Sequence, residues 1–243
     1  MATYSIYPIA LCEGPRDCSH YTYTMNAGVG RNAACYIWYI EGSEPKTLVD
    51  AGVKMSMYEE RGIPETYLIS VEEGLGKLGL KPDDIEIIIV THLHWDHIGL
   101  SHLFPNARFI VQKKELDYAR NPHPIDATIY EKDTFENLDI EVIDGEKEII
   151  PGVSAFLTPG HTPGGQSVEI ATKAGKAIIT GFCCILDTFT QNEVMKRKGW
   201  EVSAPLIHQD VRDAYDSVLK VKQRADIILA THDYAFVEGK RIP

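Results

Sequence analysis

The segment Thr91-His92-Leu93-His94-Trp95-Asp96-His97 decides how the rest of this sequence is interpreted. It follows the β-branched run IEIIIV at residues 85–90, which is typical of a buried strand, so the polar cluster lies where a strand ends and a loop begins. In an extended stretch the first two histidines and the aspartate share one face, and the last histidine follows in the next turn. Burying these groups together without a partner would leave several polar atoms unsatisfied. The cluster therefore predicts a metal site, and the alternative is a chance grouping on the surface.

Two further histidines also follow predicted strands. Residues 153–157 lead into Thr158-Pro159-Gly160-His161, and the apolar run at 225–230 leads into Thr231-His232-Asp233. Loops at strand ends are where a rigid scaffold presents chemistry. We therefore expect His161 and His232 to join the first cluster.

These motifs carry a resemblance to a known family. The pattern His-x-His-x-Asp-His after a strand resembles the signature of the metallo-β-lactamase superfamily of hydrolases, and Trp95 and Gly99 fit its usual surroundings. The other matching segments occur in the family's order and extend the resemblance over most of the chain: LVDAG at 48–52, TPGHTPG at 158–164 and THD at 231–233. The TPGHTPG loop at 158–164 and LFPNA at 103–107 are most similar to the branch that includes the acyl-homoserine lactonases.

The order of predicted elements agrees with the fold that this resemblance implies. The expected fold class is α/β, an αβ/βα four-layer sandwich of two sheets with helices outside, in a single domain over residues 1–243. Residue patterns predict strands at 3–11, 33–40, 46–50, 85–90, 107–111, 140–143, 153–157, 168–170, 177–181 and 225–230, and helices at 66–79, 113–120 and 210–224. Loops at 13–32, 121–138 and 187–209 are expected to shape a substrate pocket, with 121–138 either part of a lid or a tolerated surface insertion.

The resemblance implies a ligand set. His92, His94 and His161 would hold a first metal ion and leave a fourth position open, and Asp96, His97 and His232 would form a second site. Asp50 has two interpretations: it caps the turn before Gly52, or, as the resemblance implies, its carboxylate orients the ligand loop.

One position departs from the family pattern. In two-metal members an aspartate that follows the glycine at one strand end bridges the ions, but Phe182 follows Gly181 in this chain. The site then holds either a single tightly bound ion or a second ion with a thiolate ligand. Cys184 shares strand parity with position 182, and Cys183 would serve if the strand bulges. Thiolate favours zinc, whereas buried cysteines also serve as small apolar core residues, so both roles remain open.

The function expected from this set is that of a zinc-dependent hydrolase with one or two ions. Zinc lowers the pKa of water from about 15.7 to roughly 7, so a metal-activated hydroxide can attack a carbonyl, and Asp96 can orient this water or pass its proton to the leaving group. The resemblance favours opening of a lactone or a related cyclic ester or amide. The alternatives are a hydrolase of a linear ester, thioester or amide, an iron-dependent redox relative, and a catalytically degenerate zinc-binding protein.

Composition limits the partners. With 24 Lys and Arg against 35 Asp and Glu, the net charge is −11, which argues against binding to nucleic acid. No apolar run approaches the roughly 20 residues of a membrane span. Five cysteines are an odd number in a chain too large to need disulfides, and together with the absence of a signal-like start they indicate a cytoplasmic protein. The expected partner is a small-molecule substrate, with homodimer formation left open.

Overall fold

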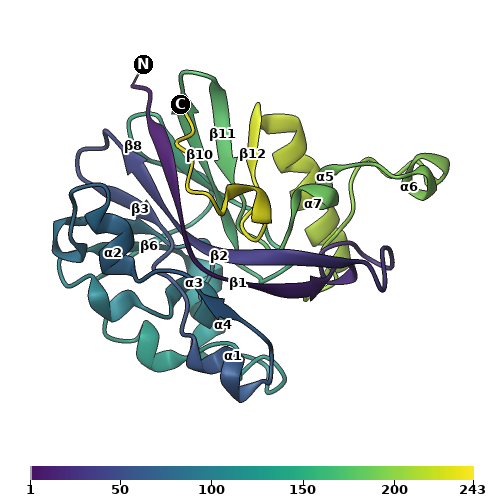
Figure 1. Cartoon of the computed structure of the whole chain (residues 1–243), viewed down its shortest axis with the longest axis horizontal. Helices are drawn as coiled ribbons and strands as arrows, with labels where there is room; N and C mark the ends of the chain where they lie inside the picture. Colours follow the sequence, from purple (N-terminus) through teal and green to yellow (C-terminus); the bar gives the residue numbers. More distant parts are fainter. Residues whose placement is uncertain (1) are drawn as a thin grey trace.

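The computed structural model describes residues 2–243, whose strands form two sheets (Figure 1). The strands are β1 (Ser5–Asp17), β2 (Gly30–Glu41), β3 (Thr47–Val49), β4 (Thr66–Tyr67), β5 (Ile87–Ile89), β6 (Arg108–Gln112), β7 (Ile140–Ile143), β8 (Lys147–Ile150), β9 (Val153–Leu157), β10 (Gln166–Thr172), β11 (Gly175–Ile179) and β12 (Ile227–Leu229). The larger sheet has the order β4-β1-β2-β3-β5-β6-β7, and the smaller has the order β12-β11-β10-β9-β8. Both sheets are mixed, because β3, β5, β6 and β7 run parallel and β12 pairs parallel with β11.

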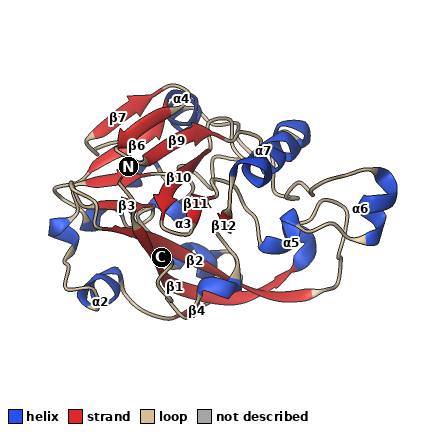
Figure 2. Cartoon of the chain, turned by 90° about the horizontal axis from the view of Figure 1, so that it is seen from above, coloured by secondary structure: helices blue, strands red, loops and turns tan. Residues whose placement is uncertain are grey.

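Helices cover the outer faces of both sheets, with α6 as an exception. The helices are α1 (Ser56–Glu60), α2 (Val71–Gly76), α3 (Trp95–Ile98), α4 (Lys113–Arg120), α5 (Leu186–Phe189), α6 (Glu193–Lys198) and α7 (Val211–Arg224). Short 3₁₀ turns occupy Cys18–His20, Pro82–Asp84, Ser101–Leu103, Lys132–Thr134 and Tyr234–Phe236. In Figure 1, α1, α2 and α4 lie on one side of the molecule and α7 on the other, and Figure 2 shows α6 standing away from the sheets. Within residues 2–243 no helix has the length and apolarity needed to cross a bilayer.

Alternation along the strands builds this layered arrangement. Trp38 and Ile89 point into the core between the two sheets, whereas their neighbours Ile37 and Ile88 point to the core beneath α1, α2 and α4. A third apolar cluster packs α5 and α7 against the smaller sheet, with Phe156, Phe182 and Val218 among its members. The αβ/βα sandwich of helix, sheet, sheet and helix expected from the sequence is therefore confirmed.

Several boundaries differ from the sequence-based expectations. The helix predicted over 66–79 is shorter, because residues 66 and 67 pair with β1 as a strand and a capping box between Ser70 and Glu73 begins the helix at Val71. The predicted loop at 13–32 is partly strand, since β1 continues to Asp17 and β2 begins at Gly30. Strand β8 was not predicted. By contrast, α4 and α7 agree with their predicted ranges within one residue.

One buried amide joins the two sheets next to the ligand loop. The Gln166 side chain, at the start of β10, donates from Nε2 to the carbonyl oxygens of Val90 (2.7 Å), which follows β5, and of Ile110 (3.0 Å), in the middle of β6. Its Oε1 accepts a hydrogen bond from Gln112 Nε2 at 2.9 Å. The carboxyl ends of the larger sheet are thus fixed against the smaller sheet by side-chain hydrogen bonds as well as by apolar packing.

Replacing Gln166 by Leu should destabilise the protein, because buried groups on β5 and β6 would lose their partner at a cost of about 1–3 kcal/mol each. Urea unfolding followed by circular dichroism measures the change. Gln223→Leu, at an exposed position on α7, is the matched control and should stay within about 0.5 kcal/mol of the wild type. Equal unfolding midpoints for Gln166→Leu and the wild type would contradict this role.

Candidate metal centre

The ligand loop consists of an extended segment followed by a short helix. His92 and His94 lie in an extended segment after β5, but the chain then turns into α3 with His94 as its N-cap. Asp96 and His97 therefore come from the first turn of a helix, and the expectation that Asp96 follows the parity of an extended stretch is wrong. The short helix nevertheless turns both side chains toward the first two histidines.

His92, His94 and His161 form the first donor group. One ring nitrogen from each lies within 4.8 Å of the others, and the Nε2 atoms of His92 and His161 are 3.2 Å apart. All three side chains are buried. The structure thus brings together three residues from two distant loops in the spacing expected of shared ligands.

Local contacts fix the direction of these rings. His161 Nδ1 lies 2.7 Å from the carbonyl oxygen of Ile207, to which it can donate, and this contact leaves Nε2 facing the group. The preceding Gly160 has φ +116°, and a Cβ there would lie 2.1 Å from the backbone nitrogen of Ala214 on α7. Only glycine permits this close approach, which explains the residue before the ligand.

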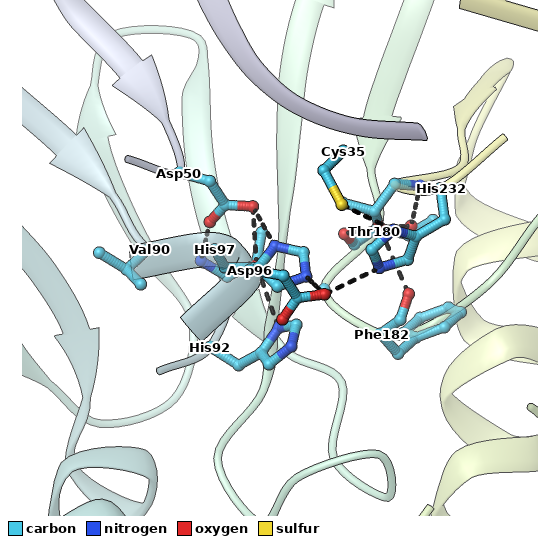
Figure 3. A network of polar contacts seen from close by, with 12 residues as sticks. Cys35, Asp50, Val90, His92, Asp96, His97, Thr180, Phe182 and His232 are labelled. Atoms are coloured by element: carbon cyan, nitrogen blue, oxygen red, sulfur yellow. Dashed lines mark hydrogen bonds and ion pairs between the residues drawn. The ribbon is translucent and has the colours of Figure 1, made fainter. Parts of the chain in front are cut away.

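Asp96 links the first donor group to a second one. It belongs to a group with His92 and His97 and also to a group with Cys35 and His232, and the group of Cys35, Asp96 and His232 is called the second donor group. Its Oδ2 lies 3.6 Å from His97 Nε2 and 3.8 Å from His232 Nε2, and Figure 3 shows the carboxylate between these two rings. All six residues predicted as ligands therefore meet in one place.

Asp50 contacts the ligand loop directly. Its buried carboxylate accepts hydrogen bonds from His97 Nδ1 (2.7 Å), from the backbone N–H of Thr91 (2.7 Å) and from Thr91 Oγ1 (3.0 Å), as Figure 3 shows in part. Its φ of 63° lies in the left-handed region, which non-glycine residues adopt at a cost and often at functional positions. Of the two interpretations of Asp50, these contacts favour orientation of the ligand loop.

Burial and neighbouring charge set the protonation of the donors. Burial lowers the pKa of His161 to about 4 and the pKa values of His92 and His94 well below the usual range, so these imidazoles are neutral near pH 7. Burial opposes ionisation of Asp96, but the adjacent His97 and His232 lower its pKa to about 2. Burial likewise opposes charge on His97, but the carboxylates of Asp96 and Asp50 raise its pKa to about 9.

The chemistry of this donor set fits a metal cation. The Nε2 atoms of His94 and His97 are buried and have no hydrogen-bond partner among residues 2–243. Buried polar atoms are normally paired, and imidazole nitrogens beside an ionised carboxylate are ligands of zinc and related ions. His97, whose pKa of about 9 makes it a cation near pH 7, would lose its proton on binding an ion. A cation held here would satisfy both nitrogens.

The strand end at Gly181 does not supply a ligand to any of these groups. The Phe182 ring packs in the apolar cluster under α7, 6.3 Å from the ring of Phe189. Cys184, predicted as a possible additional ligand, is buried in the same cluster with its Sγ 3.1 Å from Thr180 Oγ1, and it joins no donor group among residues 2–243. The parity argument fails because β11 ends at Ile179 and the backbone bends over the next residues.

Sequence reasoning missed two residues of the centre. Cys35 lies inside β2, in a run where nothing distinguishes it from other core positions. Glu115, on α4, is buried and accepts hydrogen bonds from the backbone N–H groups of Leu93 (2.9 Å) and Gly164 (3.2 Å). It therefore ties the loop of His92 and His94 to the loop of His161, a role that only the packing reveals.

A cavity of about 370 Å³ opens beside the second donor group. Cys35, Asp96 and His232 form part of its wall. Most of the remaining lining residues come from two segments, Pro15, Arg16, Asp17, His20 and Tyr21 in the first and Tyr58, Gly62, Ile63, Pro64 and Glu65 in the second; the others are Ala33, Ala34, Trp95, Cys183 and Ile207. The first of these segments was predicted to shape the pocket, but the second was not. No residue of 121–138 lines this cavity; instead the Tyr130 ring packs 4.8 Å from the ring of His94.

Comparison with known proteins agrees with this geometry. Residues 30–232 match the family model described as the metallo-β-lactamase superfamily, and this range contains every donor identified above. The chain belongs to the metallo-β-lactamase superfamily.

Relatives within the superfamily include characterised lactonases. An N-acyl homoserine lactonase from a Bacillus species is 28% identical, and the match covers 93% of this chain and 92% of the relative. N-acyl homoserine lactonase AttM from Rhizobium radiobacter is 26% identical, and the match covers 94% of this chain and 90% of the relative. A solved structure of an N-acyl homoserine lactone hydrolase, with the product N-hexanoyl-L-homoserine at its catalytic metal centre, superimposes with a TM-score of 0.75 at 27% identity and covers 100% and 98% of the two chains. The chain is thus a superfamily hydrolase related to the acyl-homoserine lactonases, with a histidine-rich candidate metal site.

Replacing Asp50 by Asn should weaken metal binding about 10–100-fold, the range typical of residues that orient ligands, because an amide cannot accept all three hydrogen bonds as a carboxylate does. Competition with a chromogenic zinc chelator measures the affinity. Asp83→Asn, at an exposed position, should bind as the wild type does. Unchanged affinity in Asp50→Asn would leave the aspartate with a capping role alone.

Proposed function

We propose that this chain is a zinc-dependent hydrolase that opens a lactone or a related cyclic ester or amide. The observation that carries the proposal is the position of Asp96, which belongs to two donor groups and also forms part of the cavity wall. A substrate in the cavity therefore lies beside the donors that would activate it.

The donors divide into two sets for this purpose. His92, His94 and His161 would hold a first ion, and Asp96, His97 and His232 would contribute to a second. Bound zinc would supply Lewis acidity toward the substrate carbonyl and would lower the pKa of water to roughly 7.

Asp96 would handle the proton of the reaction. Its carboxylate, ionised because its pKa is about 2, can accept a hydrogen bond from the attacking water on the cavity side. As the new C–O bond forms and the ring C–O bond breaks, the proton passes from the water by way of this carboxylate to the leaving oxygen. The product is a hydroxy acid, whose carboxyl group releases one proton at neutral pH.

The cavity wall supports an apolar substituent on the substrate. Tyr21, Ile63, Pro64 and Ile207 present apolar surface around the space beside Asp96. Such a wall suits an acyl or aromatic group attached to the reacting ring. The relatives named as N-acyl homoserine lactonases support the same substrate class.

Asp96→Asn should lower the rate of lactone hydrolysis at least about 100-fold, because general acid and base catalysis contributes about 10²–10⁴-fold to such reactions. The rate is followed by proton release in a weakly buffered solution. Metal analysis should still find the ion held by His92, His94 and His161. The exposed Asp139→Asn is the control and should retain full activity, whereas full activity in Asp96→Asn would refute the assigned role.

Substrate class is tested with a matched panel at equal metal content: acylated homoserine lactones, unsubstituted lactones, and linear esters, thioesters and amides with the same acyl groups. The proposal expects the largest kcat/KM for a lactone and loss of turnover after chelation, with recovery on adding zinc. A larger kcat/KM for a linear ester, thioester or amide would show that the substrate class is linear and not a lactone. Tight zinc binding without turnover of any substrate would indicate a degenerate member of the superfamily.

A further inference from the structure

The second donor group contains a thiol that the sequence pattern did not indicate. A ligand atom from each of Cys35, Asp96 and His232 lies within 4.8 Å of the other two. Cys35 Sγ is 3.9 Å from His232 Nδ1, and Figure 3 shows the sulfur on the side of the group next to the His232 ring. Cys35 lies in β2, where it pairs with Cys12 of β1, and the preceding residue, Ala34, donates from its N–H to the His232 carbonyl oxygen at 3.2 Å.

The surroundings of Cys35 suit a thiolate. The Tyr58 hydroxyl lies 3.1 Å from Sγ and can donate a hydrogen bond to it. His232 Nδ1 can donate to the Ala34 carbonyl oxygen at 3.2 Å, which leaves Nε2 toward Asp96 with a free lone pair. One ligand atom each of Cys35, His232 and Asp96 lies within 4.8 Å of the other two, a spacing that a shared ion could span.

A second observation points to a cation at the same place. His97 Nε2 is buried, lies 3.6 Å from Asp96 Oδ2, and has no hydrogen-bond partner in the part of the chain that the structure describes. An ion between His97, Asp96 and His232 would satisfy this nitrogen. The cavity gives the site access to solvent, since Cys35, Asp96 and His232 all line it.

The other thiols near the strand end are less suitable. Cys184 Sγ lies in the apolar cluster under α7 and contacts Thr180, and the Cys184 carbonyl oxygen accepts from His232 N–H at 3.2 Å. Cys183 borders the cavity but packs with Cys18, Tyr21 and Ile185 and belongs to no donor group among residues 2–243.

We propose that the Cys35 thiolate completes a second metal site with Asp96, His97 and His232, and so fills the role that an aspartate after Gly181 would otherwise have. The inference rests on the metal-dependent function proposed above. A donor set that includes sulfur selects zinc or cobalt over magnesium and manganese, which prefer oxygen ligands. The second site should therefore fill with zinc even when manganese is in excess.

X-ray absorption on the zinc-loaded wild type tests this without any substitution. The full chain is loaded under reducing conditions, since Cys12 lies opposite Cys35 in the β1–β2 register and could otherwise form a disulfide with it. Two zinc ions per chain and one sulfur neighbour at about 2.3 Å for every two ions are expected. A shell of nitrogen and oxygen alone would overturn the inference and leave the proposed function standing. No bound metal under any loading condition would overturn both.

Cobalt substitution assigns the sulfur. The cobalt-loaded wild type should show a thiolate-to-cobalt charge-transfer absorption in the near ultraviolet. Cys35→Ser should lose this absorption and fall from two ions per chain to one, whereas the matched controls Cys183→Ser and Cys184→Ser should keep both. Cys35→Asp should restore the second ion without the absorption, which separates ligand loss from misfolding. Persistence of the absorption in Cys35→Ser, or its loss in Cys184→Ser alone, would refute the assignment.

Discussion

Burial of several imidazole rings around one carboxylate is the constraint on which the rest of this structure depends. Polar groups removed from water destabilise a fold unless each finds a partner. Here two ring nitrogens, His94 Nε2 and His97 Nε2, have none among residues 2–243, although both side chains lie deep in the protein. The fold therefore holds its least favourable arrangement of polar atoms at the edge where the two sheets meet, and a cation would relieve it.

Three buried side chains keep this arrangement in place. Asp50 fixes Thr91 and His97, and Gln166 fixes Val90 and strand β6 to the smaller sheet. Glu115 joins the loops that carry His92 and His161. Each makes at least three hydrogen bonds or contacts to other polar groups, so the carboxylates and the amide are themselves well satisfied. The ligand loops are thus held in position by the surrounding protein rather than by the donors alone.

The sequence identified what depends on local pattern and missed what depends on packing. The β-branched run before Thr91 and the period of residues 210–224 predicted β5 and α7, because strand and helix periodicity are properties of neighbouring residues. Glu115 lies in a helix that the sequence predicted, but no local pattern marks it as buried, and only the approach of two distant loops makes it a buried acceptor. Cys184 joins no donor group among residues 2–243, because strand parity cannot be extended past Ile179, where the backbone leaves the sheet.

The segment after β11, where Phe182 follows Gly181, has an apolar role in place of a metal-binding one. Phe182 and Cys184 extend the apolar cluster beneath α7, so the segment after β11 contributes to the stability of the smaller sheet instead of to the donors. Cys35 on β2 instead places its sulfur within 4.8 Å of ligand atoms of Asp96 and His232. Strand β2 is paired along its length with β1, and beside Cys35 the Ala34 N–H donates to the His232 carbonyl oxygen, so backbone hydrogen bonds fix a donor placed there. A chain can therefore lose a ligand at one strand end and keep the shape of the site, provided that a neighbouring strand presents a donor of matching reach.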